Sequence, residues 1–331
     1  MALWETFGSV DEFTFVETLA TRANATARVM REKRGERREV VVKWDKHVDA
    51  AAEVELVWPL GTVCSHVLAP IGVVDDVSRA RTYAVYPYVP CGDLAGLLLR
   101  HRDEDQAHDV NMSVDSMEGT EGAEVSEERV ALAESVLACV GCALSTFHAH
   151  GVVHRDVKPA NILVATTSSA SSASGRFVLA DFGLAALMED GVRGGGGKRF
   201  QGSVAYASPQ ALGGEGGRGE ADDVWSLGVV VYECVFGRLP FGTTEMGGRE
   251  LREAIMRCGG RGGGEETTLP QVLASDPGFD RVAGLAPELA AFLMSALSPV
   301  PSDRRLPSAC HASPTCRVLA FLSLRQMHRG H

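Results

Sequence analysis

The sequence has no long apolar run, no excess of positive charge and no recognisable leader segment. Its 331 residues include 32 Lys and Arg against 43 Asp and Glu, so it lacks the basic field of nucleic-acid-binding proteins. No run reaches the roughly 18 apolar residues of a membrane-spanning helix. Residues 224–237 come nearest, but they include Glu233 and predict a buried core helix. Residues 1–5 lack the charged and apolar regions of a signal peptide. We therefore expect an intracellular protein, cytoplasmic or nuclear, with no membrane span and no nucleic-acid partner.

Paired cysteines are also missing. Eight cysteines are scattered through the chain, which predicts reduced thiols and not a disulfide framework. Cys139 and Cys142 stand in a helical pattern with no second pair nearby. Cys310, His311 and Cys316 have the residue types of a zinc site, but we favour buried or incidental thiols at these positions.

One segment has no Lys or Arg at all. Residues 103–128 contain ten Asp and Glu, which account for nearly all of the net charge of −11. A segment so acidic and poor in aromatic residues cannot bury enough apolar surface to offset its ordering entropy. We expect a disordered, solvated insert here. The alternative interpretation is a docking segment for a basic partner.

The stretch from His154 to Leu163 reads H-R-D-V-K-P-A-N-I-L and concentrates several chemical functions. Asp156 can accept a proton, Lys158 can hold a transferring phosphate and Asn161 offers an amide oxygen to a metal ion. Twenty residues after Asn161 comes Asp181, followed by Phe-Gly. Apolar residues follow Asn161, as expected where a catalytic loop leads into a buried strand.

Together and in this order, these stretches resemble the H-R-D-x-K-P-x-N and D-F-G motifs of eukaryotic protein kinases of the Ser/Thr type. The resemblance extends over roughly residues 13–307. It implies an α+β, bilobal protein kinase fold, with a small β-rich N-lobe and hinge over residues 1–89 and a larger, mainly α-helical C-lobe over residues 90–331. It also implies ATP and Mg²⁺ as cofactors and a protein Ser or Thr as the phosphate acceptor.

The resemblance assigns roles to the motif residues. Asp156 would orient the acceptor hydroxyl and take its proton, while Lys158 would stabilise the transferring γ-phosphoryl group. Asn161 and Asp181 would bind Mg²⁺, a hard ion that prefers oxygen ligands. In this family the residues corresponding to His154 and Phe182 pack in the core and do no chemistry.

A phosphate-binding lysine is expected in the strand that ends Val41-Val42-Lys43. A glutamate on the following helix, predicted over residues 49–58, would pair with Lys43. Glu55 fits this role best and Glu53 comes second. Pro59 is expected to end or kink the helix, because proline cannot donate a helical N–H.

The nucleotide side departs from the family pattern. Aligning residues 19–27 on L-G-x-G-x-x-G-x-V puts Ala20, Arg22 and Ala25 where the family has glycines, which let backbone N–H groups approach the phosphates. The apolar residues expected to line the nucleotide are Leu19, Ala27, Val41 and Leu163.

Residues 83–94 resemble the segment that joins the two lobes in the family. Tyr86 would take the gatekeeper position, and the backbone of Val89 would meet adenine. Asp93 has two interpretations, a contact with the ribose hydroxyls and an N-cap of the helix that follows. The two interpretations are compatible.

The segment from Leu184 to Gln201 contains no Ser, Thr or Tyr. Kinases with an arginine before the catalytic aspartate, as Arg155 is here, often use it to hold a phosphate on this loop. We therefore expect no conventional phosphorylation switch, and Glu189 or Asp190 would pair with Arg155 instead.

Two further motifs complete the resemblance. Residues 202–210 resemble G-T/S-x-x-Y-x-A-P-E, with Gln210 in place of the glutamate that pairs with a distant arginine, here Arg304. Residues 223–228 resemble the D-V-W-S-x-G opening of the central helix, where Asp223 would cap backbone groups of the catalytic loop.

The resemblance leaves an alternative function. The missing glycines, Pro59 and Gln210 would suit a pseudokinase that acts as a binding scaffold. Retention of the residues expected to do the chemistry favours an active protein Ser/Thr kinase. A kinase-fold enzyme that acts on a small molecule is a weaker third possibility.

Overall fold

A computed structural model describes residues 4–22, 25–111, 125–167, 175–188, 200, 202–214, 219–242, 246–258, 269–274 and 276–311. The chain forms two compact units. Among the described residues, the smaller unit holds residues 4–90 and 180–183, and the larger unit holds the rest of the chain up to residue 311. Asp181-Phe182-Gly183 thus belongs with the smaller unit.

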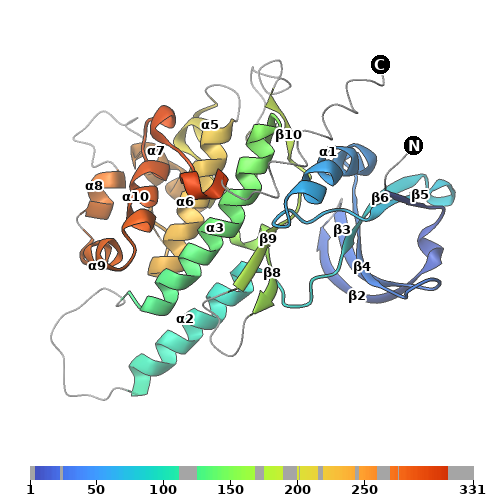
Figure 1. The fold of residues 1–331 in the computed structure, drawn as a ribbon, viewed down its shortest axis with the longest axis horizontal. Helices are drawn as coiled ribbons and strands as arrows, with labels where there is room; N and C mark the ends of the chain where they lie inside the picture. The colour runs from blue at the N-terminus through green and yellow to red at the C-terminus, as the bar shows by residue number, and fades with distance from the viewer. Residues whose placement is uncertain are drawn as a thin grey trace. The chain divides into compact units, whose positions relative to one another are not determined.

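In its described residues, the smaller unit is a six-stranded sheet with one α-helix (Figure 1). The strands lie in the order β1-β5-β6-β4-β3-β2; β1 and β5 are parallel and the other neighbours are antiparallel. Its elements are β1 (Glu5–Phe7), η1 (Val10–Glu12), β2 (Phe13–Arg22), β3 (Ala25–Glu32), β4 (Glu39–Asp45), α1 (Ala50–Val63), β5 (Gly72–Asp76), η2 (Val77–Arg79) and β6 (Arg81–Pro87).

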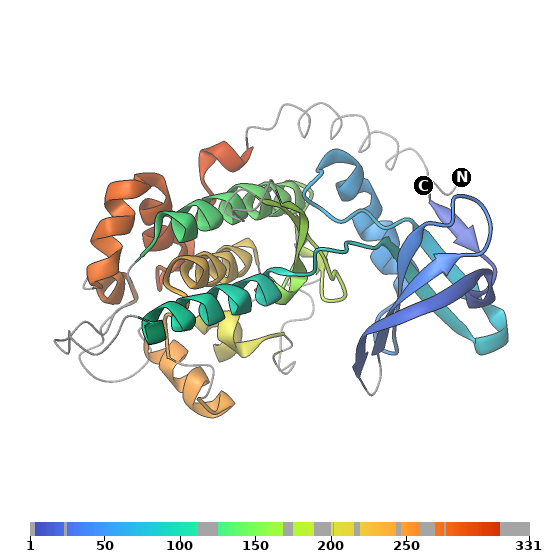
Figure 2. The ribbon, with the colours of Figure 1, turned by 90° about the horizontal axis from the view of Figure 1, so that it is seen from below.

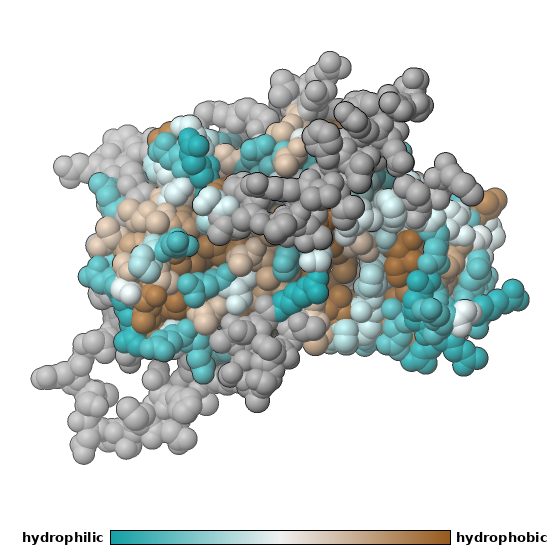
Figure 3. All heavy atoms as spheres, in the orientation of Figure 1, coloured by the Kyte–Doolittle hydropathy of each residue, from teal (hydrophilic) through white to brown (hydrophobic). Residues whose placement is uncertain are grey.

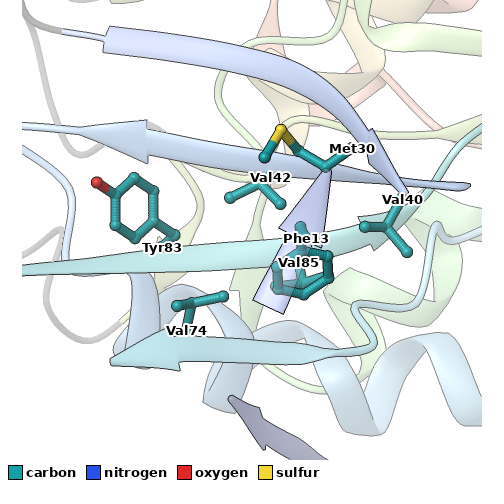
Figure 4. Packing of buried hydrophobic residues seen from close by; sticks show 7 residues of the cluster. All are labelled: Phe13, Met30, Val40, Val42, Val74, Tyr83 and Val85. Atoms are coloured by element: carbon teal, nitrogen blue, oxygen red, sulfur yellow. The ribbon is translucent and has the colours of Figure 1, made fainter. Parts of the chain in front are cut away.

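The two faces of this sheet carry different residues, because side chains alternate along a strand. One face carries a buried apolar cluster of seven residues (Figure 4). Phe7, Val10, Trp44 and Ile71 are partly buried and pack against this cluster. The cluster members are Phe13, Met30, Val40, Val42, Val74, Tyr83 and Val85. The opposite face carries Val41 and Lys43, each directly paired across the strands, Val41 with Tyr86 and Lys43 with Ala27. One strand, β4, therefore supplies both the core and the site.

The larger unit is mainly helical, so the fold as a whole is α+β. Its helices are α2 (Leu94–Asn111), α3 (Glu127–Ala149), α5 (Pro209–Gly213), α6 (Glu220–Phe236), α7 (Gly248–Cys258), α8 (Leu269–Ala274), α9 (Pro277–Leu285) and α10 (Pro287–Ala296). Its short elements are β7 (Val152–Val153), η3 (Pro159–Asn161), β8 (Ile162–Thr167), β9 (Gly175–Leu179), β10 (Ala186–Leu187), η4 (Val204–Tyr206), η5 (Pro301–Asp303) and η6 (Ser308–His311).

Helices α3 and α6 lie side by side and form the centre of this unit (Figures 1 and 2). The sequence prediction of a buried helix over residues 224–237 is confirmed by α6, in which Trp225, Leu227 and Tyr232 are almost fully buried. Among the described helices, α3 alone is long and apolar enough to suit a membrane span, although its sequence contains no unbroken apolar run of that length. However, 61% of its apolar window is buried inside the protein, as expected for a core helix.

The structure moves the bounds of two predicted elements. Helix α1 does not end at Trp58 but runs through Pro59 to Val63, because Leu60 and Val63 are buried and hold its last turn in place. Of the two effects predicted for Pro59, an end or a kink of the helix, the end is wrong. The acidic insert predicted over residues 103–128 begins later than expected, since α2 continues to Asn111, and it ends earlier, since Val125 is buried. Residues 112–124 lie outside the described part of the chain. The run of Ser, Ala and Thr over residues 165–175 predicts a flexible loop between two strands, and residues 168–174 of that stretch are likewise outside the described part.

The surface of the smaller unit that faces the viewer in Figure 3 is mostly hydrophilic, with small apolar patches. Strand β2 illustrates the contrast between inside and outside, because Phe13 is 4% exposed and Phe15 is 54% exposed.

This pair gives a matched test of the apolar cluster. We expect Phe13→Ala to lower the free energy of unfolding by about 3–5 kcal/mol, since it removes a buried aromatic side chain. Phe15→Ala on the same strand should cost less than about 1 kcal/mol. Urea unfolding followed by circular dichroism measures both values, and equal losses in the two variants would contradict the assignment of the core.

Candidate functional site

Lys43 is held between two carboxylates of the smaller unit. Its Nζ atom lies 3.1 and 3.3 Å from the Oε atoms of Glu53 on α1. It also lies 2.6 Å from Oδ1 of Asp181. Burial lowers the pKa of Lys43, but the charges of Asp181 and Glu53 outweigh this effect, so that the pKa is raised above its ordinary value. The lysine is therefore a fixed positive charge.

The prediction that Glu55 pairs with Lys43 is wrong, because Glu55 is exposed to solvent. Glu53, the second choice, makes the ion pair, and its side chain is only 3% exposed. Counting along the sequence could not separate the two residues. They are two positions apart on a helix and point to different sides, and only the contact with Lys43 decides between them.

Tyr86 has a role that the sequence did not reveal. Its buried hydroxyl donates a 2.7 Å hydrogen bond to Oε1 of Glu53, so that this carboxylate accepts from both Lys43 and Tyr86. Burial, followed by the neighbouring charge of Glu53, raises the pKa of Tyr86 well above its ordinary value. The neutral hydroxyl is thus available as a donor.

Asp181 and Phe182 take up different positions in the smaller unit. The side chain of Asp181 is 49% exposed, and its backbone has a left-handed φ of 60°. Phe182 is 2% exposed, and its ring centroid lies 6.3 Å from that of Tyr86, which confirms the expected core position of Phe182. The buried ring anchors the turn that presents the carboxylate.

Of the residues expected to line a nucleotide, Leu19, Ala27, Val41 and Val89 belong to the smaller unit, while Asp93 and Leu163 belong to the larger one. Ala27 and Val41 are half-buried on the Lys43 face of the sheet, while Leu19 on β2 is 50% exposed. Val89 is half-buried after the end of β6. The hairpin of β2 and β3 closes with Arg22 paired to Ala25, and residues 23–24 between them are outside the described part of the chain.

In the larger unit, Asp156 stands at the centre of a hydrogen-bonded loop. Its Oδ2 atom accepts from Lys158 Nζ at 2.5 Å and from Asn161 Nδ2 at 3.0 Å. Its Oδ1 atom accepts from the backbone N–H of Ser203 at 3.2 Å. The same Nδ2 donates to the backbone carbonyl of Asp156 at 2.8 Å, which fixes the orientation of the Asn161 amide. Three predicted site residues thus meet here.

Asp223 holds this loop in place from the start of α6. Its two carboxylate oxygens accept the backbone N–H groups of His154, at 2.9 Å, and Arg155, at 2.8 Å. The capping role predicted for Asp223 is confirmed. His148 on α3 also lies 2.9 Å from Asp223 Oδ2, a contact across 75 residues that no sequence motif predicts. Arg155 has a φ of 71°, a left-handed conformation that the two hydrogen bonds support.

The predicted pair of Gln210 and Arg304 is also confirmed. Arg304 donates to the amide oxygen of Gln210 at 2.7 Å. Its guanidinium lies 4.7 Å from the ring centroid of Trp225, within the range of a cation–π contact. Burial lowers the pKa of Arg304 to about 10. The buried arginine also has a carboxylate nearby, since Oδ1 of Asp222 lies 3.8 Å from its Nη1 atom.

Asp93 acts as a helix cap. Its Oδ1 atom accepts the backbone N–H of Gly96 at 2.8 Å in the first turn of α2. The N-cap interpretation is confirmed, while the contact with a ribose stays a prediction. Leu163 lies beside Asp93 through an isolated backbone bridge. Glu189 and Asp190, the expected partners of Arg155, are outside the described residues.

The described residues contain no cluster of three or more His, Cys, Asp or Glu side chains that could hold a metal ion. Cys310 is buried with its sulfur 3.7 Å from the carbonyl of Leu137, and burial raises its pKa to about 11. Cys316, part of the zinc alternative, is outside the described residues. Mg²⁺ needs only one or two protein carboxylates, so the absence of such a cluster among the described residues says nothing against a magnesium site.

Comparison with known proteins decides the family, because the family model of the protein kinase domain matches residues 17–314. The chain belongs to the protein kinase domain family. It is 36% identical over 137 residues to CBL-interacting serine/threonine-protein kinase 24 of Arabidopsis thaliana, which covers 41% of the chain and 28% of that protein. It is 41% identical over 100 residues to sucrose non-fermenting protein kinase 1 of Fusarium virguliforme, covering 30% of the chain and 13% of that protein.

A third relative is the SNF1-like protein kinase ssp2 of Schizosaccharomyces pombe, 40% identical over 100 residues. That match covers 30% of the chain and 16% of the relative. The matches thus span less than a third of these relatives, whose names describe Ser/Thr and SNF1-type kinases. The kinase domain family accounts for the order of Lys43, Asp156, Asn161 and Asp181 along the chain.

The ion pair of Lys43 allows a test that does not depend on turnover. We expect Glu53→Gln to lower the pKa of Lys43, because it removes one of two carboxylates that raise it. A larger neutral fraction should then make Lys43 acylate faster at a fixed, mildly alkaline pH. Quantitative mass spectrometry of acylated peptides measures the rate. Glu55→Gln is the matched control and should leave the rate unchanged; the reverse pattern would restore Glu55 as the partner.

Proposed function

We propose that the chain is an ATP-dependent protein kinase that transfers the γ-phosphoryl group to Ser or Thr hydroxyls of proteins. The observation that carries the proposal is the retention of two assembled groups. Lys43, Glu53 and Asp181 are joined by ion pairs in the smaller unit, and Asp156, Lys158 and Asn161 by hydrogen bonds in the larger one. A binding scaffold has no physical need of both.

In the larger unit, Asp156 would receive the acceptor hydroxyl. Its carboxylate is fixed by three donors and is 11% exposed, so little reorientation is needed when a hydroxyl donates to it. Lys158, already in contact with Asp156, would place its positive charge on the γ-phosphoryl group as negative charge moves there. The proton of the hydroxyl would pass to Asp156.

The residues present suit Mg²⁺. Asp181 offers an exposed carboxylate, and Asn161 offers an amide oxygen whose orientation is set because Nδ2 donates to Asp156. Both are the oxygen ligands that Mg²⁺ prefers. Bound Mg²⁺ would neutralise the charge of the phosphates during transfer. Lys43, held by Glu53, would anchor the α- and β-phosphates of ATP.

The experiment that tests the proposal is transfer of radiolabelled phosphate from ATP to a generic protein substrate. We expect Asp156→Asn to lower turnover by about 10²–10⁴-fold, the usual contribution of a positioned base. Asp181→Asn should reduce labelling to background. Asp75→Asn, at an exposed position on β5, is the matched control and should behave as the unsubstituted protein.

Labelling at background level by the unsubstituted protein and by all three variants would contradict the proposed kinase activity. If such inactive protein still bound a partner tightly, the scaffold alternative would stand in its place. Labelling of a small molecule but of no protein would favour a kinase-fold enzyme that acts on small molecules.

We further propose that activity is not controlled by phosphorylation of the loop after Gly183, because residues 184–201 have no acceptor hydroxyl. Ser203 is the first candidate, and its backbone already contacts Asp156. We expect phosphatase treatment of the active protein to leave turnover unchanged. Phosphosite mapping checks the same point, and a phosphate on Ser203 that controls activity would overturn it.

We also propose an intracellular location. The cysteines in the described part of the chain are free thiols, as expected in a reducing compartment. Docking of a basic partner stays the alternative to a solvated segment for residues 103–128, and it rests on the ten acidic residues of this stretch.

A further inference from the structure

Residues 4–12, here called the N-terminal segment, lie before the part of the chain that matches the kinase family model, which begins at residue 17. They are nevertheless built into the smaller unit. Strand β1 adds a sixth strand to the sheet by pairing in parallel with β5, with Glu5 opposite Gly72 and Phe7 opposite Val74. The pairing is extended by a 3.1 Å hydrogen bond from the N–H of Glu5 to the carbonyl of Ile71.

Gly72 makes this pairing possible. A Cβ atom at Gly72 would lie 2.0 Å from the backbone carbonyl oxygen of Glu5, a distance that no side chain can occupy. The backbone of β1 thus sits in space that exists only because residue 72 is glycine. The seat for the N-terminal segment is therefore encoded on β5, some 65 residues further along the chain.

Polar contacts fasten the rest of the segment. Asp76, 1% exposed at the end of β5, accepts from the hydroxyl of Ser9 at 3.3 Å and from the N–H of Val10 at 3.2 Å. Arg79 binds both Asp76, at 2.5 Å, and Asp11, at 3.0 Å. Asp76 thus holds η1 in place both directly, through Ser9 and Val10, and indirectly, through Arg79 and Asp11.

Two further contacts attach β1. Arg38 on the β3–β4 turn reaches both carboxylate oxygens of Glu5 at 3.0 Å. Phe7 packs edge-on against Phe13 of the apolar cluster, with ring centroids 5.0 Å apart. The segment is thus attached by backbone pairing, by charge and by aromatic packing.

The start of the segment reaches α1, the helix that carries Glu53. The rings of Trp4 and Trp58 lie 6.4 Å apart at an angle of 57°, within the range of favourable aromatic pairs. Trp58 follows Glu53 by five residues, about 7.5 Å along the helix axis. A contact at Trp58 therefore resists rotation and sliding of the same rigid helix that aims Glu53 at Lys43.

We propose that the N-terminal segment is a positioning element that clamps α1 to the edge of the sheet and thereby keeps Glu53 on Lys43. Trp4 of the segment makes the contact with α1, and Trp58 is the residue of α1 that it contacts. The catalytic part of this inference rests on the proposed kinase function; the clamp on α1 does not.

The test uses two substitutions, Trp4→Ala and Gly72→Ala. The first removes a contact made by the segment itself, and the second blocks the pairing of β1 with β5. Hydrogen–deuterium exchange of the α1 amides around Glu53, without nucleotide, reports on the clamp independently of catalysis. We expect faster exchange in both variants, by roughly three- to tenfold, the size expected when one aromatic pair is lost. Trp4→Phe should restore the exchange of the unsubstituted protein.

Kinetics provide the second readout. Misplacement of Glu53 should raise KM for ATP and lower kcat, while KM for the protein substrate stays unchanged. A purely structural loss would only reduce the active fraction and would leave KM for ATP as it was. The double variant should be no worse than the worse single variant, because both remove the same contact.

Val77→Ala, at a side chain that is 81% exposed on η2, is the control and should change neither readout. Unchanged α1 exchange in both Trp4→Ala and Gly72→Ala would overturn the proposal, whatever the activity. A fall in kcat alone, with KM for ATP constant, would also overturn it. If the unsubstituted protein transferred no phosphate, the proposed function would fail, while the exchange data would still decide whether α1 is clamped.

Discussion

The buried carboxylate of Asp223 is the constraint on which the catalytic loop depends. It is 1% exposed and accepts from the amides of His154 and Arg155, while His148 approaches from α3. Burial alone would raise its pKa, but the hydrogen bond and charge of His148, together with His154, hold the pKa below its usual value. A buried amide left without an acceptor costs about 1–3 kcal/mol, so the loop has a single favourable path. That path places Asp156 where Lys158, Asn161 and the backbone of Ser203 can all reach it.

In the smaller unit, the alternation of side chains along a strand fixes the position of Lys43. Val40 and Val42 face the apolar cluster, so Val41 and Lys43 must face the other way, where α1 packs. A slip of one residue in β4 would bury the ammonium group of Lys43 in the cluster. The cluster therefore fixes the register that presents the lysine, and the stability of the sheet and the geometry of the site are one property. Glu53 follows because α1 contacts β5 and β6 on this side.

The sequence predicted those parts of the site that local motifs specify. The catalytic loop, the cap by Asp223 and the pair of Gln210 with Arg304 were all expected, since each depends on a residue type at a fixed place in a motif. What it missed depends on contacts between distant segments. Glu53 and Glu55 differ only in the side of α1 they occupy, Pro59 is tolerated because the next turn is buried, and His148 meets Asp223 across 75 residues. The contact of Trp4 with Trp58 has no motif either.

The two carboxylates that hold Lys43 are not equivalent, because one of the two contacts is harder to break than the other. Glu53 is buried and receives a second donor from Tyr86, so moving it would leave a buried hydroxyl and a buried charge without partners. Asp181 is half exposed and can change partners at little cost. A divalent cation would therefore compete with Lys43 for Asp181 and not for Glu53. Lys43 would then keep its ion pair with Glu53. The N–H that it had donated to Asp181 could donate to a phosphate instead. Tyr86 thus matters for the chemistry, because it decides which of the two contacts of Lys43 is permanent.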